Sequence, residues 1–529
     1  MKIHKLVPSW VGAGALVLTC AFLQWHSGAY SSDVSGNPDE AAHVVSGLMV
    51  HDYLAHFFVP RMASWPSNPR TYAEAYYAHF PKVAIGHWPP LFYVVQAIWM
   101  FAFGRTKTAL LALMLVTMAA AACLLMHLAR SICGEFAAFV FTLAFLLLPI
   151  AQQSLYTVMP DALLALLSIA LMIACGNALE GKQRWWIACW VLIVAAISVH
   201  LRGAALFPVP WIAMVLARRR ELFKQRILWI ATALTLCVAA PWLLFTHQAG
   251  SLRFASVLDA AVSFPTHAFW CLGPILFVLC VAGAILAPYR KQPRWAAVTG
   301  MLLGTWVFSS LAIVPWDDRY FVCALPASIV LATLGLRSLA IAANKILGGP
   351  LQVAVFVPTV LVAAVSVVQA FPLERKQNLA YEPLVARILA SPEGIDPVYL
   401  IAGDALHEGD FIASVAFQDP AVDHIVVRST KALAVTDWGM NSYRPRFQSS
   451  AEMAAALNKS WVSLVVIQQD CPRPDVRMLR SAMSEFGWQP VPAQSNLLVF
   501  RRSAAFPAGK ITVDVDMGWT LGKDIQASP

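Results

Sequence analysis

The sequence predicts a mainly α-helical, polytopic membrane protein with an extramembrane α/β domain near its C-terminus. Hydrophobic residues make up 59% of the 529 positions and charged residues 13%, against about 45–50% and about 25% in soluble domains. Apolar runs follow one another up to about residue 371, and beyond it charges and prolines become frequent. We therefore expect about 11–13 transmembrane helices in residues 1–371, an α/β domain in residues 372–505 and a tail at 506–529.

The first apolar run, from about residue 7 to residue 25, follows Lys2 and Lys5. A cleaved signal peptide is an alternative, but the run is long and no small-residue cleavage site closes it well. We expect an uncleaved first helix whose N-terminus lies in the cytoplasm.

Basic residues between the later apolar runs orient the chain, because cytoplasmic loops of membrane proteins are enriched in lysine and arginine. Four segments carry them: 182–184, 218–226, 290–294 and 337–345. The intervening turns and everything after residue 371 then face outward. When the membrane crossings are counted back from these loops to the N-terminus, the apolar runs supply one crossing too many. Either residues 90–103 therefore re-enter without crossing, or another segment is broken.

The net charge of +9 does not indicate a nucleic-acid partner, since the basic residues sit in these short clusters. Ten cysteines are scattered without any CxxC pair, so neither a zinc site nor a disulfide framework is indicated.

Short strand-like and helical patterns alternate after residue 371, which is typical of a layered, parallel α/β domain. No glycine-rich phosphate fingerprint follows the first strand, and we expect the tail to be poorly ordered. Strands are predicted at 398–401, 425–427, 462–467 and 497–500, and helices at 451–457 and 476–486.

Two adjacent acids, Asp39 and Glu40, open a moderately apolar stretch in the predicted outer loop, residues 27–87. Histidines and an aspartate interrupt this stretch at 41–59, so we expect a helix on the membrane surface. Acids at a helix start often serve only as a cap that favours the helix dipole. Alone, the pair indicates a cap more strongly than an active site.

Other unusual polar groups fall on the same predicted outer face. His87 precedes Pro89-Pro90, Asp161 opens an apolar run, Arg202 follows another, and Asp317-Asp318-Arg319-Tyr320 closes a late loop. Each has a structural alternative: a helix start, a cap or an interfacial anchor. Ionisable groups at membrane depth are costly, so their grouping on one face indicates function.

Together these motifs resemble the GT-C membrane glycosyltransferases, in particular the protein O-mannosyltransferases and lipid A aminoarabinose transferases. The resemblance covers roughly residues 1–340 and rests on Asp39-Glu40 with His43, on 87–91, on 159–163 and on 317–320 with Pro326.

The resemblance implies transfer of a sugar, with inversion, from a polyprenyl-phosphate donor to a glycan, lipid or protein acceptor outside a cell (inner) membrane. It implies Asp39 as general base, Glu40 as its support and Asp161 as a second acid, with no metal or cofactor. The family often has a lysine before the paired prolines; here His87 stands there and Lys82 lies five residues earlier, so either, or Arg319, could neutralise the phosphate. Residues expected to bind substrate are His43, Lys82, His87, Arg202, Asp317, Arg319 and Tyr320.

Two other classes of function agree less well with the sequence. A transporter or lipid flippase would be expected to show paired halves or helices broken at mid-membrane, and the sequence shows no internal repeat. A membrane-anchored sensor would account for the α/β domain but not for the acids of the first loop.

Overall fold

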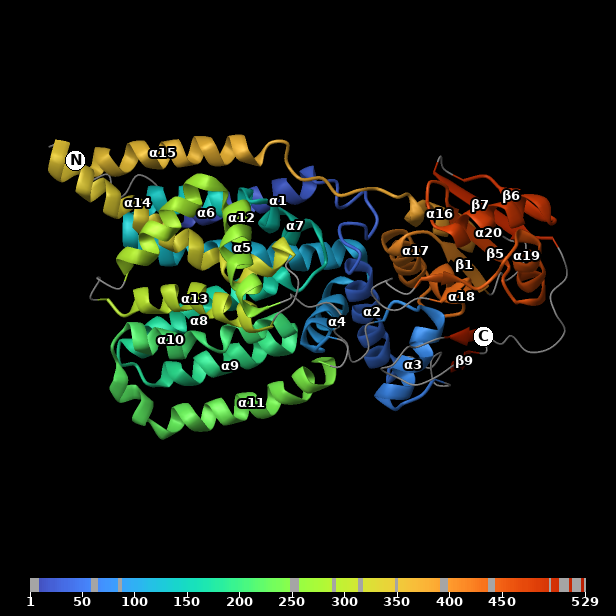
Figure 1. Cartoon of the computed structure of the whole chain (residues 1–529), viewed down its shortest axis with the longest axis horizontal. Coiled ribbons are helices and arrows are strands. Elements are labelled where there is room, and N and C mark those ends of the chain that lie inside the picture. The colour runs from blue at the N-terminus through green and yellow to red at the C-terminus, as the bar shows by residue number, and fades with distance from the viewer. Residues whose placement is uncertain are drawn as a thin grey trace. The chain divides into compact units, whose positions relative to one another are not determined.

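Helices dominate the structure, a computed structural model (Figure 1). It describes residues 9–58, 65–83, 88–247, 256–287, 292–312, 317–347, 351–390, 398–435, 443–493, 496–503, 513–515 and 525–527. Contacts divide the chain into two units. The helical unit comprises residues 1–27, 88–92 and 111–375, and the α/β unit comprises residues 28–87, 93–110 and 376–529. Contacts thus group the outer loop with the C-terminal region, whereas the predicted domain ranges stay a proposal.

The helical unit is an assembly of helices joined by short segments. In order they are α1 (Ser9–His26), α5 (Lys107–Cys133), α6 (Glu135–Leu147), α7 (Pro149–Tyr156), α8 (Asp161–Leu179), α9 (Arg184–Val199), η3 (Leu201–Leu206), α10 (Val209–Leu216), η4 (Arg220–Lys224), α11 (Arg226–His247), α12 (Val257–Leu286), α13 (Arg294–Ala312), η6 (Asp318–Cys323), α14 (Leu325–Leu347) and α15 (Leu351–Ala370). Helix α4 (Leu91–Phe103) and the start of α5 run into the α/β unit.

Several of these helices are long and apolar enough to cross a bilayer. Within the described residues there are five such helices, or six if the bent pair α6–α7 counts as one span, and others are shorter apolar helices. The bend between α6 and α7 is 68°. The α6–α7 pair is therefore either a broken span or a re-entrant loop, and the total number of spans stays a prediction.

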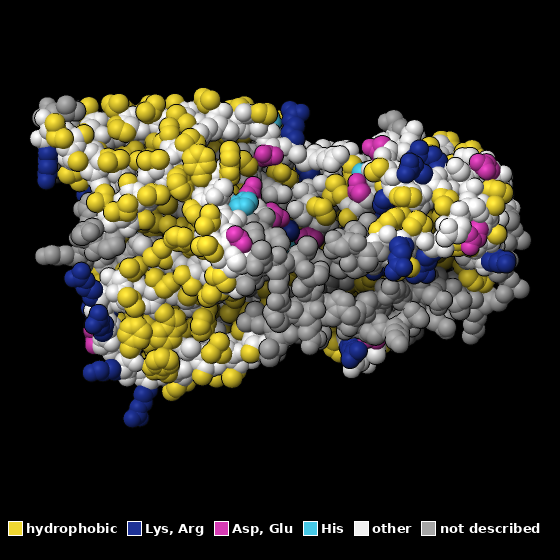
Figure 2. All heavy atoms as spheres, in the orientation of Figure 1, with side chains coloured by type: hydrophobic (Ala, Val, Ile, Leu, Met, Phe, Trp, Pro, Cys, Tyr) yellow, Lys and Arg dark blue, Asp and Glu magenta, His cyan; other side chains and the backbone are white. Residues whose placement is uncertain are grey.

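Close helix packing and an apolar exterior are both found in this unit. A Cβ on Gly283 of α12 would lie 1.9 Å from the carbonyl oxygen of Leu331 on α14, so the two backbones approach as only small residues allow. Large apolar side chains point outward, among them Trp270 and Val368, which are 72% and 73% exposed. Figure 2 shows hydrophobic side chains over most of the visible face of this unit, with Lys and Arg at one end. This distribution fits a lipid-facing surface.

Helix α8 shows which residues lie at the two ends of the helical unit. It runs from Asp161 to Leu179, and the 19 residues span about 28 Å, close to the thickness of a bilayer core. The basic segment at 182–184 follows, and α9 returns to the end at which α8 began. At the basic end, Arg294 contacts Glu180 at 3.3 Å. Asp161 thus lies at the end of α8 opposite this basic segment, and the charge rule predicts that this end faces outward.

The C-terminal part of the α/β unit contains a five-stranded sheet in the order β2-β1-β5-β7-β6. Strand β1 pairs in parallel with β2 and β5, whereas β7 pairs antiparallel with β5 and β6. The predicted α/β domain is confirmed, but its sheet is mixed and not wholly parallel. The strands are β1 (Val398–Ala402), β2 (Ile425–Arg428), β5 (Leu464–Gln468), β6 (Trp488–Val491) and β7 (Leu497–Arg502).

Helices flank this sheet, and two minor sheets accompany it. The helices are α16 (Tyr381–Leu389), α17 (Ala405–Gln418), α18 (Ser429–Ala432), α19 (Ser450–Lys459) and α20 (Pro474–Glu485). The small strands are β3 (Ala434–Val435) with β4 (Arg444–Pro445), and β8 (Val513–Val515) with β9 (Ile525–Ala527). Within the predicted tail, the structure describes only these two strands, β8 and β9. The other residues of 506–529, for which disorder was predicted, lie outside the described residues.

The outer loop adds α2 (Glu40–His56) and α3 (Pro69–His79) to the same unit, and α2 packs against α17. The predicted helix is confirmed, but its first half is buried against protein: Val44, Val45 and Leu48 are wholly inaccessible. Arg105 also links α2 to α17. It contacts Asp52 of α2 at 2.8 Å and donates to the carbonyl oxygens of Ala416 and Phe417 at the end of α17.

Candidate functional site

A charged cluster forms at the end of the helical unit where α8 begins. Asp161, the first residue of α8, accepts from Nη1 of Arg202 in η3 at 3.3 Å. The two side chains are 5% and 17% exposed. Asp161 follows the N-cap residue, Pro160, and its carboxylate contacts an arginine 41 positions away in the sequence.

Arg202 also lies flat against an aromatic ring from a third element. Its Cζ is 3.6 Å from the ring centroid of Tyr320 in η6, a close cation–π contact. Arg319, the preceding residue in η6, has its Cζ 5.8 Å from the same ring and its Nε 2.6 Å from Oδ2 of Asp317. Asp317 caps η6 by accepting from the backbone N–H of Arg319. The structure thus brings together five predicted residues from three separate segments of the sequence.

Histidines that sequence analysis did not single out for this site border the cluster. The ring of His200 lies 6.3 Å from that of Trp88 and its Nδ1 accepts from the backbone N–H of Arg202. His267 of α12 contacts Asp318 at 2.6 Å. Each was visible in the sequence as a histidine in a predicted outer turn, but nothing there indicated its partner.

Asp39 and Glu40 belong to the α/β unit, and the structure gives them different surroundings. Asp39 occupies the N-cap position of α2 but makes no side-chain capping hydrogen bond. Glu40 is completely buried: Nζ of Lys376 donates to Oε1 at 2.7 Å, and the backbone N–H of Gly36 donates to Oε2 at 2.8 Å. Residue Asp39 is partly exposed, whereas Glu40 is buried, so of these two acids Asp39 is the more accessible to a substrate.

His43 and Lys82 lie in the same unit as Asp39. His43 is buried, and its Nδ1 is 3.1 Å from the hydroxyl of Tyr93 on α4. Burial lowers the pKa of Lys82 to about 8, with Arg428 acting in the same direction and the carboxylates of Asp39 and Glu408 acting against it. Lys82 is therefore a half-buried cation within electrostatic reach of Asp39. His87 lies outside the described residues.

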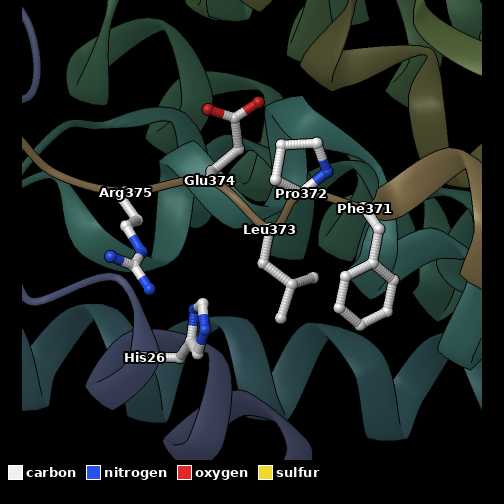
Figure 3. A pocket seen from close by; sticks show the side chains of 6 residues that line it. All are labelled: His26, Phe371, Pro372, Leu373, Glu374 and Arg375. Carbon is white, nitrogen blue, oxygen red and sulfur yellow. The ribbon is translucent and has the colours of Figure 1, made fainter.

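A cavity of about 540 Å³ opens elsewhere in the helical unit, between the end of α1 and the segment after α15. Figure 3 shows the guanidinium of Arg375 directed toward the His26 ring, whereas the carboxylate of Glu374 points away from it. None of the predicted site residues lines this cavity. The lining residues are His26, Phe371, Pro372, Leu373, Glu374 and Arg375.

The predicted site residues therefore fall into two groups. Asp161, Arg202, Asp317, Arg319 and Tyr320 form one cluster in the helical unit. Asp39, Glu40, His43 and Lys82 lie in the α/β unit. Lys376, the buried partner of Glu40, was missed because it lies 336 positions away in a polar connecting segment.

Comparisons with known proteins agree with this architecture. Residues 87–245 match the family described as dolichyl-phosphate-mannose-protein mannosyltransferase. These residues include Trp88, Asp161 and Arg202. No curated protein sequence matches the chain.

Solved structures with a similar fold extend the likeness to nearly the whole chain. ArnT from Cupriavidus metallidurans bound to undecaprenyl phosphate is 14% identical, with a TM-score of 0.59, 93% of this chain and 97% of that chain covered. The oligosaccharyltransferase of Archaeoglobus fulgidus in the apo form is 12% identical, with a TM-score of 0.55, and 89% and 70% of the two chains are covered.

Both of these proteins are GT-C glycosyltransferases. The resemblance predicted from the sequence is thereby confirmed: this chain is a multi-pass membrane protein with the fold of the GT-C glycosyltransferases.

Proposed function

We propose that this protein is an integral-membrane glycosyltransferase that moves a sugar from a polyprenyl-phosphate-linked donor to an acceptor at the outer face of a cell (inner) membrane. The observation that carries the proposal is the cluster of Asp161, Arg202, Arg319 and Tyr320, assembled from three separate elements at the outer end of the helices. A transferase with a lipid-phosphate donor needs fixed cations beside an apolar surface. The undecaprenyl phosphate bound by ArnT, whose fold is similar, supports this class of donor.

In the proposed reaction, Asp39 acts as general base. It takes the proton of the acceptor hydroxyl while the acceptor oxygen forms a bond to the anomeric carbon. The bond from that carbon to the phosphate oxygen breaks, and polyprenyl phosphate leaves with the electron pair, so the configuration inverts. Because the leaving group is already a phosphate, no opposed acid is needed, unlike in glycosidases.

Arginine suits the proposed recognition of the donor phosphate, because its planar guanidinium stays charged and can donate several hydrogen bonds. Arg202 is held by Asp161 on one side and by the Tyr320 ring on another, which fixes the direction of its remaining donors. We assign Arg202 and Arg319 to the phosphate first and Lys82 to the negative charge that develops as the phosphate leaves. Glu40 serves to hold the start of α2 through Lys376.

Replacing Asp39 by Asn tests the assignment of the base. A general base contributes about 10²–10⁴-fold to rate, so D39N should lower sugar transfer by at least about 100-fold without lowering the thermal stability of the purified protein. The measurement is mass spectrometry of glycans, lipids and proteins from a deletion strain that expresses each variant.

Glu452→Gln is the matched control, because Glu452 is also an acid in the first turn of a helix of the same unit. It should transfer sugar as the wild type does. Full activity of D39N would overturn the role of Asp39, whereas identical glycan profiles in deletion and wild-type strains would overturn the proposed function itself.

A further inference from the structure

Helix α17 of the C-terminal α/β domain lies directly against the stretch that carries the proposed base. A Cβ on Gly409 of α17 would lie 3.0 Å from Cβ of Ala41, the second residue of α2. The same atom would lie 3.0 Å from Cε and 3.2 Å from Nζ of Lys82. A methyl group at Gly409 would therefore require Ala41 or the end of the Lys82 side chain to move by a few tenths of an ångström, so the present position of Lys82 depends on the absence of a side chain at Gly409.

The ammonium group of Lys82 also faces the first turn of α17. Its Nζ lies 3.5 Å from the carbonyl oxygen of Ala405. Three charged groups act on it: the carboxylates of Asp39 and Glu408, and the guanidinium of Arg428 at the end of β2. Of these, Glu408 and Arg428 both come from the C-terminal domain.

Glu408 is a fixed anion. It is fully buried and accepts hydrogen bonds from Arg428 Nε, Ser429 Oγ, and both the backbone N–H and the hydroxyl of Thr430, at 2.7 to 3.0 Å. Arg473 Nη1 lies 3.6 Å from it. Burial tends to raise the pKa of Glu408, but the arginines and these hydrogen bonds hold it below its usual value. Glu408 therefore keeps its charge and its place at neutral pH.

We propose that α17 is part of the active site, with Gly409 and Glu408 as positioning residues that seat the Lys82 ammonium beside Asp39. This inference rests on the proposed function, within which it gives the C-terminal domain a specific task. Lys82 must be protonated to neutralise the departing phosphate. Activity should consequently fall as the pH rises through the pKa of Lys82, about 8.

Charge variants on α17 and β2 test whether these groups act on Lys82, because they should shift the pH–rate profile in opposite directions. In Glu408→Gln the loss of an anion lowers the pKa of Lys82, so the alkaline limb of the pH–rate profile should move to lower pH by about 0.5 unit or more. In Arg428→Gln the loss of a cation should move it to higher pH by a similar amount. The double variant should lie close to the wild type, and Lys82→Arg should remove the limb because a guanidinium stays charged.

Glycine variants test the packing. Gly409→Ala should lower kcat at least about tenfold at pH 7, because the new methyl group displaces Lys82. The matched control is Gly403→Ala, whose Cβ would come nearest to Gln468 and His407, at 2.9 Å, in the same domain. It should cost as much thermal stability as Gly409→Ala while retaining activity. Equal activity of the two variants would overturn the role of Gly409.

A readout that needs no transfer separates this inference from the proposed function. Competitive acetylation of Lys82 in the purified full-length protein, quantified on its peptide across pH 6–10, reports the titration of that amine directly. The expected result is the same pair of opposite shifts in Glu408→Gln and Arg428→Gln. The inference would be overturned if the titration midpoint of Lys82 did not move in the two variants, or moved in the same direction in both. Opposite shifts in a protein that transfers no sugar would refute only the proposed function and with it the catalytic use of Lys82.

Discussion

Two ion pairs, one in each unit, each involve an acid at the start of a helix, but they differ in how accessible they are to solvent. Glu40 and Lys376 lie 2.7 Å apart and are both wholly inaccessible. Asp161 and Arg202 lie 3.3 Å apart, retain some exposure, and border an aromatic ring. A fully buried pair has no face for a substrate, and removing one partner leaves an uncompensated charge. A looser, partly exposed pair can exchange one of its contacts for a ligand.

This comparison separates structural charges from candidate substrate contacts. In the sequence, Glu40 and Asp161 look alike, since each is an acid that precedes an apolar helix. Glu40 is now assigned to holding α2, and Asp161 to orienting Arg202. Substitutions in each pair should therefore produce different kinds of defect.

The largest expected effect is on stability. Lys376→Met should destabilise the protein by about 3–5 kcal/mol, the usual cost of stranding one member of a buried ion pair. The measurement is the thermal or denaturant unfolding of the purified protein. Arg70→Met is the control, because Arg70 pairs with Glu74 while its own side chain is 69% exposed, and exposed pairs contribute about 0–1 kcal/mol. Equal losses in the two variants would contradict a special role for the buried pair.

An intermediate effect is expected on catalysis. Arg202→Lys keeps the charge but loses the planar contact with Tyr320 and the forked donors, so kcat/KM for the lipid-linked donor should fall about 10–100-fold. Arg294→Lys provides a matched control: Arg294 also contacts an acid, Glu180, at 3.3 Å, but at the basic end of the unit. Its kinetics should be those of the wild type. A similar loss in both variants would mean that Arg202 acts only in packing.

The smallest effect is expected at the start of α17. Asp404 caps this helix by accepting from the N–H groups of Leu406 and His407, and hydrogen bonds that include His407 outweigh burial and lower its pKa to about 2. Asp404→Ala should cost about 1 kcal/mol at pH 7.

The pH dependence of that loss follows from the sign of the shift. A depressed folded-state pKa stabilises the protein above the unfolded value of about 3.9, and the stabilisation disappears as the pH falls toward 2. The difference in melting temperature between wild type and D404A should therefore shrink between pH 4 and pH 2.5. Ser449→Ala, which removes the non-titrating cap of α19, should show a constant difference. A constant difference for D404A would contradict the assignment.

Local sequence patterns predicted much of the fold. The strands β1, β2, β5 and β7 were found from short apolar runs, and the apolar helices from hydropathy. Strand β6 was missed because it includes Pro490 and leaves Gln489 and Pro490 exposed. Such an edge strand lacks the apolar run or the alternation that identifies a strand.

The site could be predicted only in part, for a related reason. The grouping of Asp161, Arg202 and Arg319 followed from charge topology, which fixes the end of a helix at which a residue lies. Which side chains pair there depends on contacts between distant segments, and the sequence gives no local signal for them. The burial of Glu40 by Lys376 and the contact of Lys82 with Gly409 are both of this kind.

The packing of α2 against α17 also has a consequence for how the protein is made. Glu40 meets its partner Lys376 only after 336 further residues have been synthesised, and Arg105 meets the end of α17 only after 312. Until then, the apolar face around Val44 and Leu48 lacks its cover. Contacts so distant in sequence form late and slowly. Chains truncated before α17 should therefore be cut by added protease within α2, whereas chains that include α17 should resist this cleavage.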